Sequence, residues 1–150
     1  MPFTLISSAF AGGRAIPRQY TCDGAGRSPL LRWSGAPAGT GSFALVVHDP
    51  DAPGGDFTHW LLFDIPAGVH ELHEGATTLP GISGTNDFGH LGYGPPCPPP
   101  GPRHRYVFAL FALDRPSLGL HRGAHRAQVE AALHGHIRAR AELMGVYRRE

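Results

Sequence analysis

Two carboxylates stand at a proline-stiffened turn, where Asp49 and Asp51 alternate with Pro50 and precede Pro53. Proline fixes the backbone φ angle, so this turn has little freedom to move. A carboxylate held in such a turn could orient a histidine or accept a hydrogen bond from a ligand. An Asx turn, in which both Asp side chains bond local backbone amides, is the alternative. The residues by themselves are compatible with either.

A histidine follows this turn at the distance that a hairpin return requires. His59 comes eight residues after Asp51 and opens the next apolar strand. An imidazole beside a carboxylate is oriented and charged by it. His59 could therefore face Asp49, and the alternative is a surface or satisfied core histidine, the usual role of a lone histidine at a strand start.

A second pair of polar side chains begins a later apolar strand. His104 and Tyr106 lie two residues apart, so on a strand they point to the same face, while Arg105 points to the other. An imidazole and a phenol on one face are a suitable donor set for an anionic oxygen. Tyr106 could equally be a core aromatic whose hydroxyl bonds a backbone carbonyl. The preceding loop, 92–101, is rich in Gly and Pro and so has a fixed shape.

Other chemistries have weaker support. No spacing of His, Asp or Cys resembles a short metal motif, so we expect no metal and no other cofactor. The glycines of 92–101 are not followed by Gly-Lys-Ser/Thr or by a helix, which argues against a nucleotide phosphate loop. For nucleophilic catalysis, Cys97 near His104 is the one pair to consider.

Size and charge limit the classes of partner. The 150 residues predict a single domain, 1–150, with one real core. A formal net charge of +1 and the absence of any continuous basic run argue against a nucleic-acid partner. No apolar stretch is long enough to span a membrane and no signal peptide is visible, so we expect a cytoplasmic protein without integral membrane association. A Cys22–Cys97 disulfide cannot be deduced from two cysteines, and in the cytoplasm both should be reduced.

Three nearly continuous apolar runs predict the centre of a sheet that is covered on both faces. These runs are 42–48, 59–65 and 105–113. Shorter strands are expected at 3–7 and 30–33, with an irregular edge strand within 14–23. The segment 66–101 carries few helix signals, so the connections look like loops and hairpins, which favours an antiparallel or mixed sheet.

One helix is predicted over roughly 123–144. Val129, Leu133 and Ile137 fall on one stripe, and Arg126 and Glu130 form an i,i+4 pair on another face. Gly145 would end this helix, and residues 146–148 would return to an edge of the sheet.

Ordered motifs over nearly the whole chain resemble the phosphatidylethanolamine-binding protein family, in particular its bacterial Raf-kinase-inhibitor-like branch. The motifs are Cys22–Gly24, Ser28–Leu30, Trp33–Gly35, Asp49–Pro53, Phe57–Trp60, Asn86–Gly89, Gly92–Gly101 and His104–Tyr106, with a similar ending over Gly135–Tyr147. The resemblance implies a mainly β fold, in which a central antiparallel sheet is flanked by a smaller sheet and by a C-terminal α-helix.

The resemblance also implies a small anion pocket that accepts phosphate-like headgroups. By position in the motifs, the ligand-binding residues would be Asp49, Asp51, Pro53, His59, Gly94, Pro95, Pro96, His104 and Tyr106. Pro95 stands where bacterial relatives often carry Gly, and it has no backbone N–H to offer a ligand.

The favoured function is therefore a binding or regulatory protein for a small phosphate- or carboxylate-bearing ligand, without catalytic residues. A second hypothesis is an inhibitor of a kinase or serine protease that acts through protein–protein contacts. A third is a phosphoester-processing enzyme with His59 and His104 as its acid/base pair. A homodimer is compatible with all three.

Overall fold

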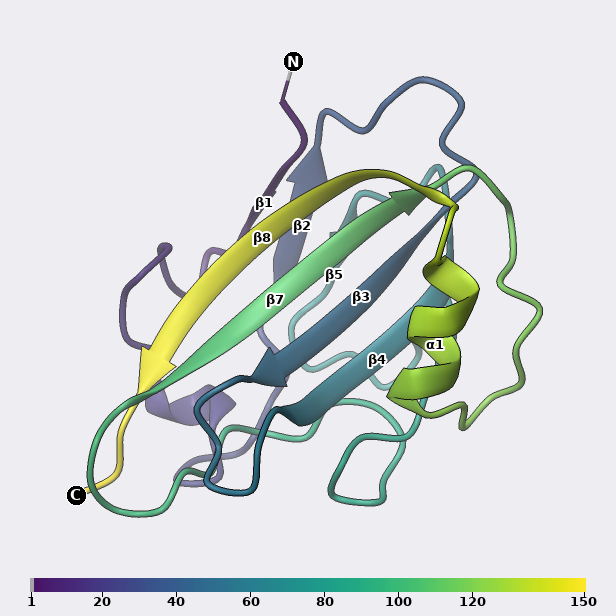
Figure 1. The fold of residues 1–150 in the computed structure, drawn as a ribbon. Coiled ribbons are helices and arrows are strands. Elements are labelled where there is room, and N and C mark those ends of the chain that lie inside the picture. The colour runs from purple at the N-terminus through teal and green to yellow at the C-terminus, as the bar shows by residue number, and fades with distance from the viewer. Residues whose placement is uncertain (1) are drawn as a thin grey trace.

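The computed structural model describes residues 2–150 (Figure 1). In chain order the elements are β1 (Thr4–Ile6), a 3₁₀ turn η1 (Arg18–Tyr20), β2 (Leu31–Ser34), β3 (Ser42–Asp49), β4 (Phe57–Pro66), β5 (Glu71–Leu72), β6 (Ile82–Ser83), β7 (His104–Leu113), α1 (Arg126–Leu133) and β8 (Ile137–Tyr147). The predicted strands at 3–7, 30–33, 42–48, 59–65 and 105–113 are all confirmed, with ends that shift by one or two residues.

The three apolar runs form the middle of a five-stranded antiparallel sheet with the order β6-β4-β3-β7-β8. A three-stranded antiparallel sheet, β1-β2-β5, lies behind it, and α1 lies in front of it (Figure 1). This is the mainly β arrangement that the resemblance implies.

Alternating side chains of β3 pack into two separate cores, one on each face of the sheet, which explains why its sequence is apolar without a break. Phe43, Leu45 and Val47 pack between the two sheets. Ala44 and Val46 point the other way and pack under α1. A strand covered on both faces has no solvent side on which polar residues would be favoured.

The predicted helix over 123–144 is wrong for its second half. The helix ends at Leu133, and Gly135 follows with a φ of 82°, a left-handed conformation that suits glycine at a helix end. The chain then runs as β8 along the whole of β7. In β8 the buried Ala141 and Leu143 alternate with exposed arginine and glutamate, which is the period of a strand.

Two smaller expectations also change. The segment 14–23 is not an edge strand: it contains η1 and a single bridge between Ala15 and Val146. Gly145 lies inside β8 instead of ending a helix. Among the described residues, no helix has the length and apolar character needed to cross a membrane.

Candidate functional site

The site lies where β3 ends and β4 and β7 begin. Because the strands are antiparallel, the end of β3 and the starts of β4 and β7 lie at the same end of the sheet, so Asp49, His59 and His104 meet there. Val47 pairs with Trp60 and His48 pairs with Thr58, which leaves His59 as an extra, unpaired residue in β4. Such a bulge re-aims a side chain. It places His59 in the same pocket as Asp49.

Asp49 is buried and bonds His104 instead of His59. Its Oδ2 lies 2.6 Å from His104 Nδ1, and its Oδ1 accepts the backbone N–H of Asp51 at 2.8 Å. The Asp49–His59 pair suggested by the sequence is therefore corrected to Asp49–His104. The register explains the difference, because β7 is the direct neighbour of β3 and brings His104 alongside its last residue. The bond to Asp51 is an Asx turn of the kind that the alternative interpretation anticipated.

His59 has a different partner. Its Nδ1 lies 2.7 Å from the backbone carbonyl oxygen of Gly94, in the loop before β7. Burial lowers the pKa of His59 below its ordinary value, and the Gly94 carbonyl and the Asp49 charge offset this only in part. His59 is therefore neutral at pH 7.

The partners fix which nitrogen of each ring carries the proton. A carbonyl oxygen and an ionised carboxylate only accept hydrogen bonds, so Nδ1 is the protonated nitrogen in both His59 and His104. In the neutral rings Nε2 is then a bare acceptor. Each ring becomes a donor toward a ligand only when it takes up a second proton.

Tyr106 supplies the hydroxyl of the site. The ring is 1% exposed, and its hydroxyl has no hydrogen-bond partner within residues 2–150. Burial raises the pKa of Tyr106 above its ordinary value, and so does the Asp49 carboxylate, through its charge and as an acceptor close to the phenol, so the phenol keeps its proton. A buried polar group without a partner is costly, and in a pocket it is the natural contact for a ligand.

The pocket encloses about 160 Å³, and most of its wall is apolar. This volume is enough for a small ionic group, because a cavity needs only about 10–15 Å³ of such space to hold one water molecule. It is lined by Asp49, Ala52, Pro53, Phe57, His59, Phe88, Cys97, Pro98, Pro99, His104 and Tyr106. The rings of Phe57, His59 and Phe88 contact one another in tilted and edge-on arrangements, with centroids 4.8–5.4 Å apart.

Five of the nine expected site residues line this pocket: Asp49, Pro53, His59, His104 and Tyr106. The others lie outside it. Asp51 turns to the surface, where both carboxylate oxygens accept from the Arg105 guanidinium at 2.8 and 2.9 Å. These bonds hold the pKa of Asp51 at about 2.

The three remaining expected residues form the far side of the loop. Gly94 contributes its carbonyl to His59, and the Pro96 carbonyl accepts the backbone N–H of Cys22 at 3.0 Å. Gly94 and Pro95 line a neighbouring groove. They position the pocket wall without lining it.

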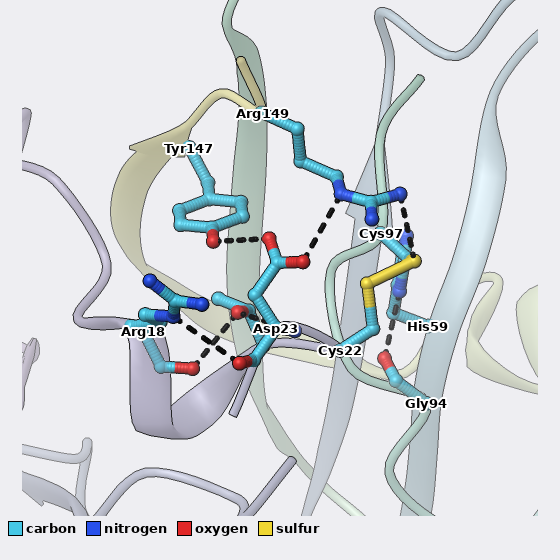
Figure 2. Close-up of a disulfide and its surroundings, with 9 residues drawn as sticks. Arg18, Cys22, Asp23, His59, Gly94, Cys97, Tyr147 and Arg149 are labelled. Atoms are coloured by element: carbon cyan, nitrogen blue, oxygen red, sulfur yellow. Dashed lines mark hydrogen bonds and ion pairs between the residues drawn. A yellow bond between two sulfur atoms is a disulfide. The ribbon is translucent and has the colours of Figure 1, made fainter. Parts of the chain in front are cut away.

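The two cysteines are joined in a disulfide, with their Cα atoms 5.3 Å apart (Figure 2). The sequence leaves this pairing open, and reduced cysteines are expected only for a cytoplasmic protein; the structure contains the bond. The bond also removes the thiol that a Cys97–His104 catalytic pair requires. Within residues 2–150, no group of three or more His, Cys, Asp or Glu side chains could hold a metal ion.

Comparisons with known proteins show the family and the fold of the chain. The family model of the phosphatidylethanolamine-binding protein matches residues 6–148. The chain belongs to this family. A UPF0098 protein of Aquifex aeolicus is 48% identical over 97% of this chain and 88% of its own length.

Two solved structures share the family fold over the full length. The crystal structure of the homolog CT736 from Chlamydia trachomatis matches with a TM-score of 0.94 and 41% identity, covering 99% of each chain. Escherichia coli YbcL, described as a member of the mammalian family, matches with a TM-score of 0.93 and 34% identity, covering all of both chains.

Some residues that line the pocket of this phosphatidylethanolamine-binding protein family member are not identified by the sequence analysis. Phe57 and Phe88 lie within two of the motifs that carried the resemblance, yet they were not assigned to the pocket. An aromatic residue two positions from a histidine is equally typical of a core, so only the fold shows that these rings face the cavity. Pro98 and Pro99 were part of the proline run, and nothing local distinguishes them from Pro95 and Pro96.

Proposed function

We propose that this member of the phosphatidylethanolamine-binding protein family binds the phosphate or carboxylate group of a small ligand in the pocket of His59, His104 and Tyr106. The observation that carries the proposal is the Tyr106 hydroxyl, which is buried, keeps its proton and has no partner within residues 2–150. It has a proton to donate to an anionic oxygen that enters the pocket beside it.

The two histidines add charge when the ligand arrives. Each ring keeps its Nδ1 proton on a protein acceptor, so an anion can bond Nε2 only if the ring gains a proton or if the ligand brings one. A monoprotonated phosphate can donate its own P–OH to one Nε2. Binding is therefore linked to proton uptake, and affinity falls as the pH rises through the histidine titration.

Asp49 acts as a positioning residue in this proposal. Its carboxylate would repel an anion directly, but it is buried and engaged by His104 and by the Asp51 amide. It orients the His104 ring and balances the charge of the protonated form. Affinity for a bare anion is expected near millimolar, about −4 kcal/mol, because a few hydrogen bonds must offset desolvation.

Tyr106→Phe tests the proposal, because it removes only the hydroxyl. A ligand-binding hydroxyl without a protein partner predicts that the variant is as stable as the wild type or more stable by about 1 kcal/mol, since a buried unpaired polar group is lost. Its phosphate affinity should fall by about tenfold, the value of one hydrogen bond to a charged group. Chemical denaturation and NMR titration measure the two quantities.

Tyr93→Phe is the matched control. The Tyr93 hydroxyl donates to the backbone carbonyl of Tyr20 at 2.7 Å, away from the pocket. This variant should lose about 1 kcal/mol of stability and keep its phosphate affinity. If Tyr106→Phe instead loses stability and binds phosphate like the wild type, the Tyr106 hydroxyl is structural and the proposal is wrong.

We further propose that the chain functions as one domain, because β3 contributes to both cores. The cytoplasmic location stays a prediction, and the disulfide makes it worth testing by cell fractionation, since disulfides are typical of oxidising compartments.

A further inference from the structure

The disulfide lies at the surface and forms part of the pocket wall. Cys22 and Cys97 are both exposed, so a small reductant can reach the bond. Cys97 and the two prolines that follow it line the pocket. The bond joins segments 75 residues apart in sequence, which are the turn after η1 and the loop before β7.

The loop that carries this wall has few other attachments. Six of the eight residues from 95 to 102 are prolines, which leaves only Cys97 and Gly101 with a backbone N–H. Gly101 donates to the Arg149 carbonyl at 3.2 Å, and the Pro96 carbonyl accepts from Cys22 at 3.0 Å. With so few hydrogen bonds of its own, the segment is held by the packing of the buried Pro96 and Pro98, by its bridge to Arg149 and by the disulfide.

The two sulfur atoms have different surroundings. Arg149 Nη1 lies 3.7 Å from Cys97 Sγ, and Arg149 Nε lies 3.2 Å from the carboxylate of Asp23, which fixes the guanidinium in place (Figure 2). Asp23 is held in turn by the Tyr147 hydroxyl. A cation beside a sulfur stabilises it as a departing thiolate, so attack on Cys22 is favoured.

We propose that the Cys22–Cys97 disulfide is a redox-sensitive latch on the pocket, an inference that rests on the anion-binding function proposed above. A dithiol reductant attacks Cys22 Sγ through one thiolate, and the S–S bond breaks with Cys97 leaving as a thiolate beside Arg149. The second thiol of the reductant then closes on the mixed disulfide. Cys22 is released as a thiol, and the reductant, having given two electrons, leaves as its own disulfide.

Opening the latch weakens anion binding in two ways. The wall formed by Pro98 and Pro99 loses its covalent attachment to the turn after η1. A Cys97 thiolate also places a negative charge at the edge of a pocket that takes an anion. Reduction should therefore lower phosphate affinity by about fivefold or more, and reoxidation should restore it.

The first experiment locates the attack. The oxidised protein is exposed briefly to a small excess of 2-mercaptoethanol, quenched with acid and mapped by mass spectrometry. The latch predicts that the adduct forms on Cys22 while Cys97 is free. Arg149→Gln should slow reduction by dithiothreitol by about threefold, and Arg148→Gln, an exposed neighbour, should not. Adducts mainly on Cys97, or equal rates in both variants, overturn the proposed order of attack.

The second experiment compares oxidised and reduced protein by phosphate titration and by hydrogen exchange of the Gly101 amide. The latch predicts weaker binding and faster Gly101 exchange after reduction. Equal affinity and equal exchange in the two states overturn the latch but leave the binding function intact. If the oxidised protein fails to bind phosphate, the proposed function is wrong. In that case the Gly101 exchange still tests the loop separately, and equal exchange rates in the oxidised and reduced protein would show that reduction does not loosen it.

Discussion

Sulfate binding can show how the two histidines work, because sulfate carries no proton near neutral pH and therefore cannot supply one to the pocket. With His59 neutral, the Tyr106 hydroxyl is a donor, while Nε2 of His59 is a bare acceptor. The Tyr106 hydroxyl can donate one hydrogen bond to such an anion, but a second donor appears only when the His59 imidazole is protonated. We therefore expect sulfate binding to be coupled to the uptake of one proton by His59.

The magnitude follows from the state of His59. Burial holds its pKa below the ordinary value of 6.5, so above pH 6.5 the free protein has not yet bound this proton. Because binding requires the uptake of one proton, the sulfate dissociation constant rises tenfold, or about 1.4 kcal/mol, for each unit by which the pH is raised. From pH 6.5 to 7.5 the dissociation constant should rise by about one order of magnitude.

NMR titration at constant ionic strength measures this slope, because surface charges would otherwise add a screening effect. His59→Gln provides the test variant, since an amide N–H donates at every pH. In that variant the slope should become shallower by about one unit. His121→Gln, at an exposed position, is the matched control and should keep the wild-type slope. A flat profile in the wild type, or an unchanged slope in His59→Gln, would refute the reasoning.

Three further predictions concern stability and the shape of the pocket. Reducing the Cys22–Cys97 disulfide, which closes a 75-residue separation, should lower the free energy of unfolding by about 4 kcal/mol in urea denaturation, and a loss below about 1 kcal/mol would contradict the role of the cross-link. Asp51→Asn should cost about 0.5–1 kcal/mol near neutral pH, because its arginine pair is partly exposed. The Asp51 contribution is present above pH 3.8 and is lost as the pH falls toward its folded pKa of about 2, so the difference in unfolding free energy between wild type and variant should disappear over that range. Phosphate affinity should not change. A difference in unfolding free energy that grows in acid would be inconsistent with this pair. Gly94→Ala should displace Phe88, because the new Cβ would lie 2.4 Å from its ring, and stability should fall by about 1–3 kcal/mol; an unchanged Phe88 ring in NMR spectra would disprove the displacement.

The predictable part of the fold is the part whose sequence pattern has one interpretation. The run 42–48 is apolar without a break, and a doubly covered strand is its simplest explanation. The segment 137–147 is ambiguous, because Ala, Arg, Glu, Leu and Met are good helix formers, while its alternation fits a strand. Pairing with β7 decides in favour of the strand, and that contact is not visible in the local sequence.

The site shows the same division. The shared face of His104 and Tyr106 follows from the two-residue period of a strand, and both line the pocket. The partner of Asp49 could not be predicted, because it depends on the bulge at His59 and on the register between β3 and β7. The disulfide could not be predicted from the local sequence either, because only the tertiary structure brings Cys22 and Cys97 together.

The most direct measurement is an NMR titration of the oxidised protein with phosphate and with phosphoethanolamine, followed at His59, His104 and Tyr106, in the wild type and in His59→Ala. An anion pocket predicts saturable shifts at all three residues in the wild type, with a dissociation constant near millimolar, and their loss in the variant. No saturable shift in either protein would contradict the assignment of this pocket as a binding site.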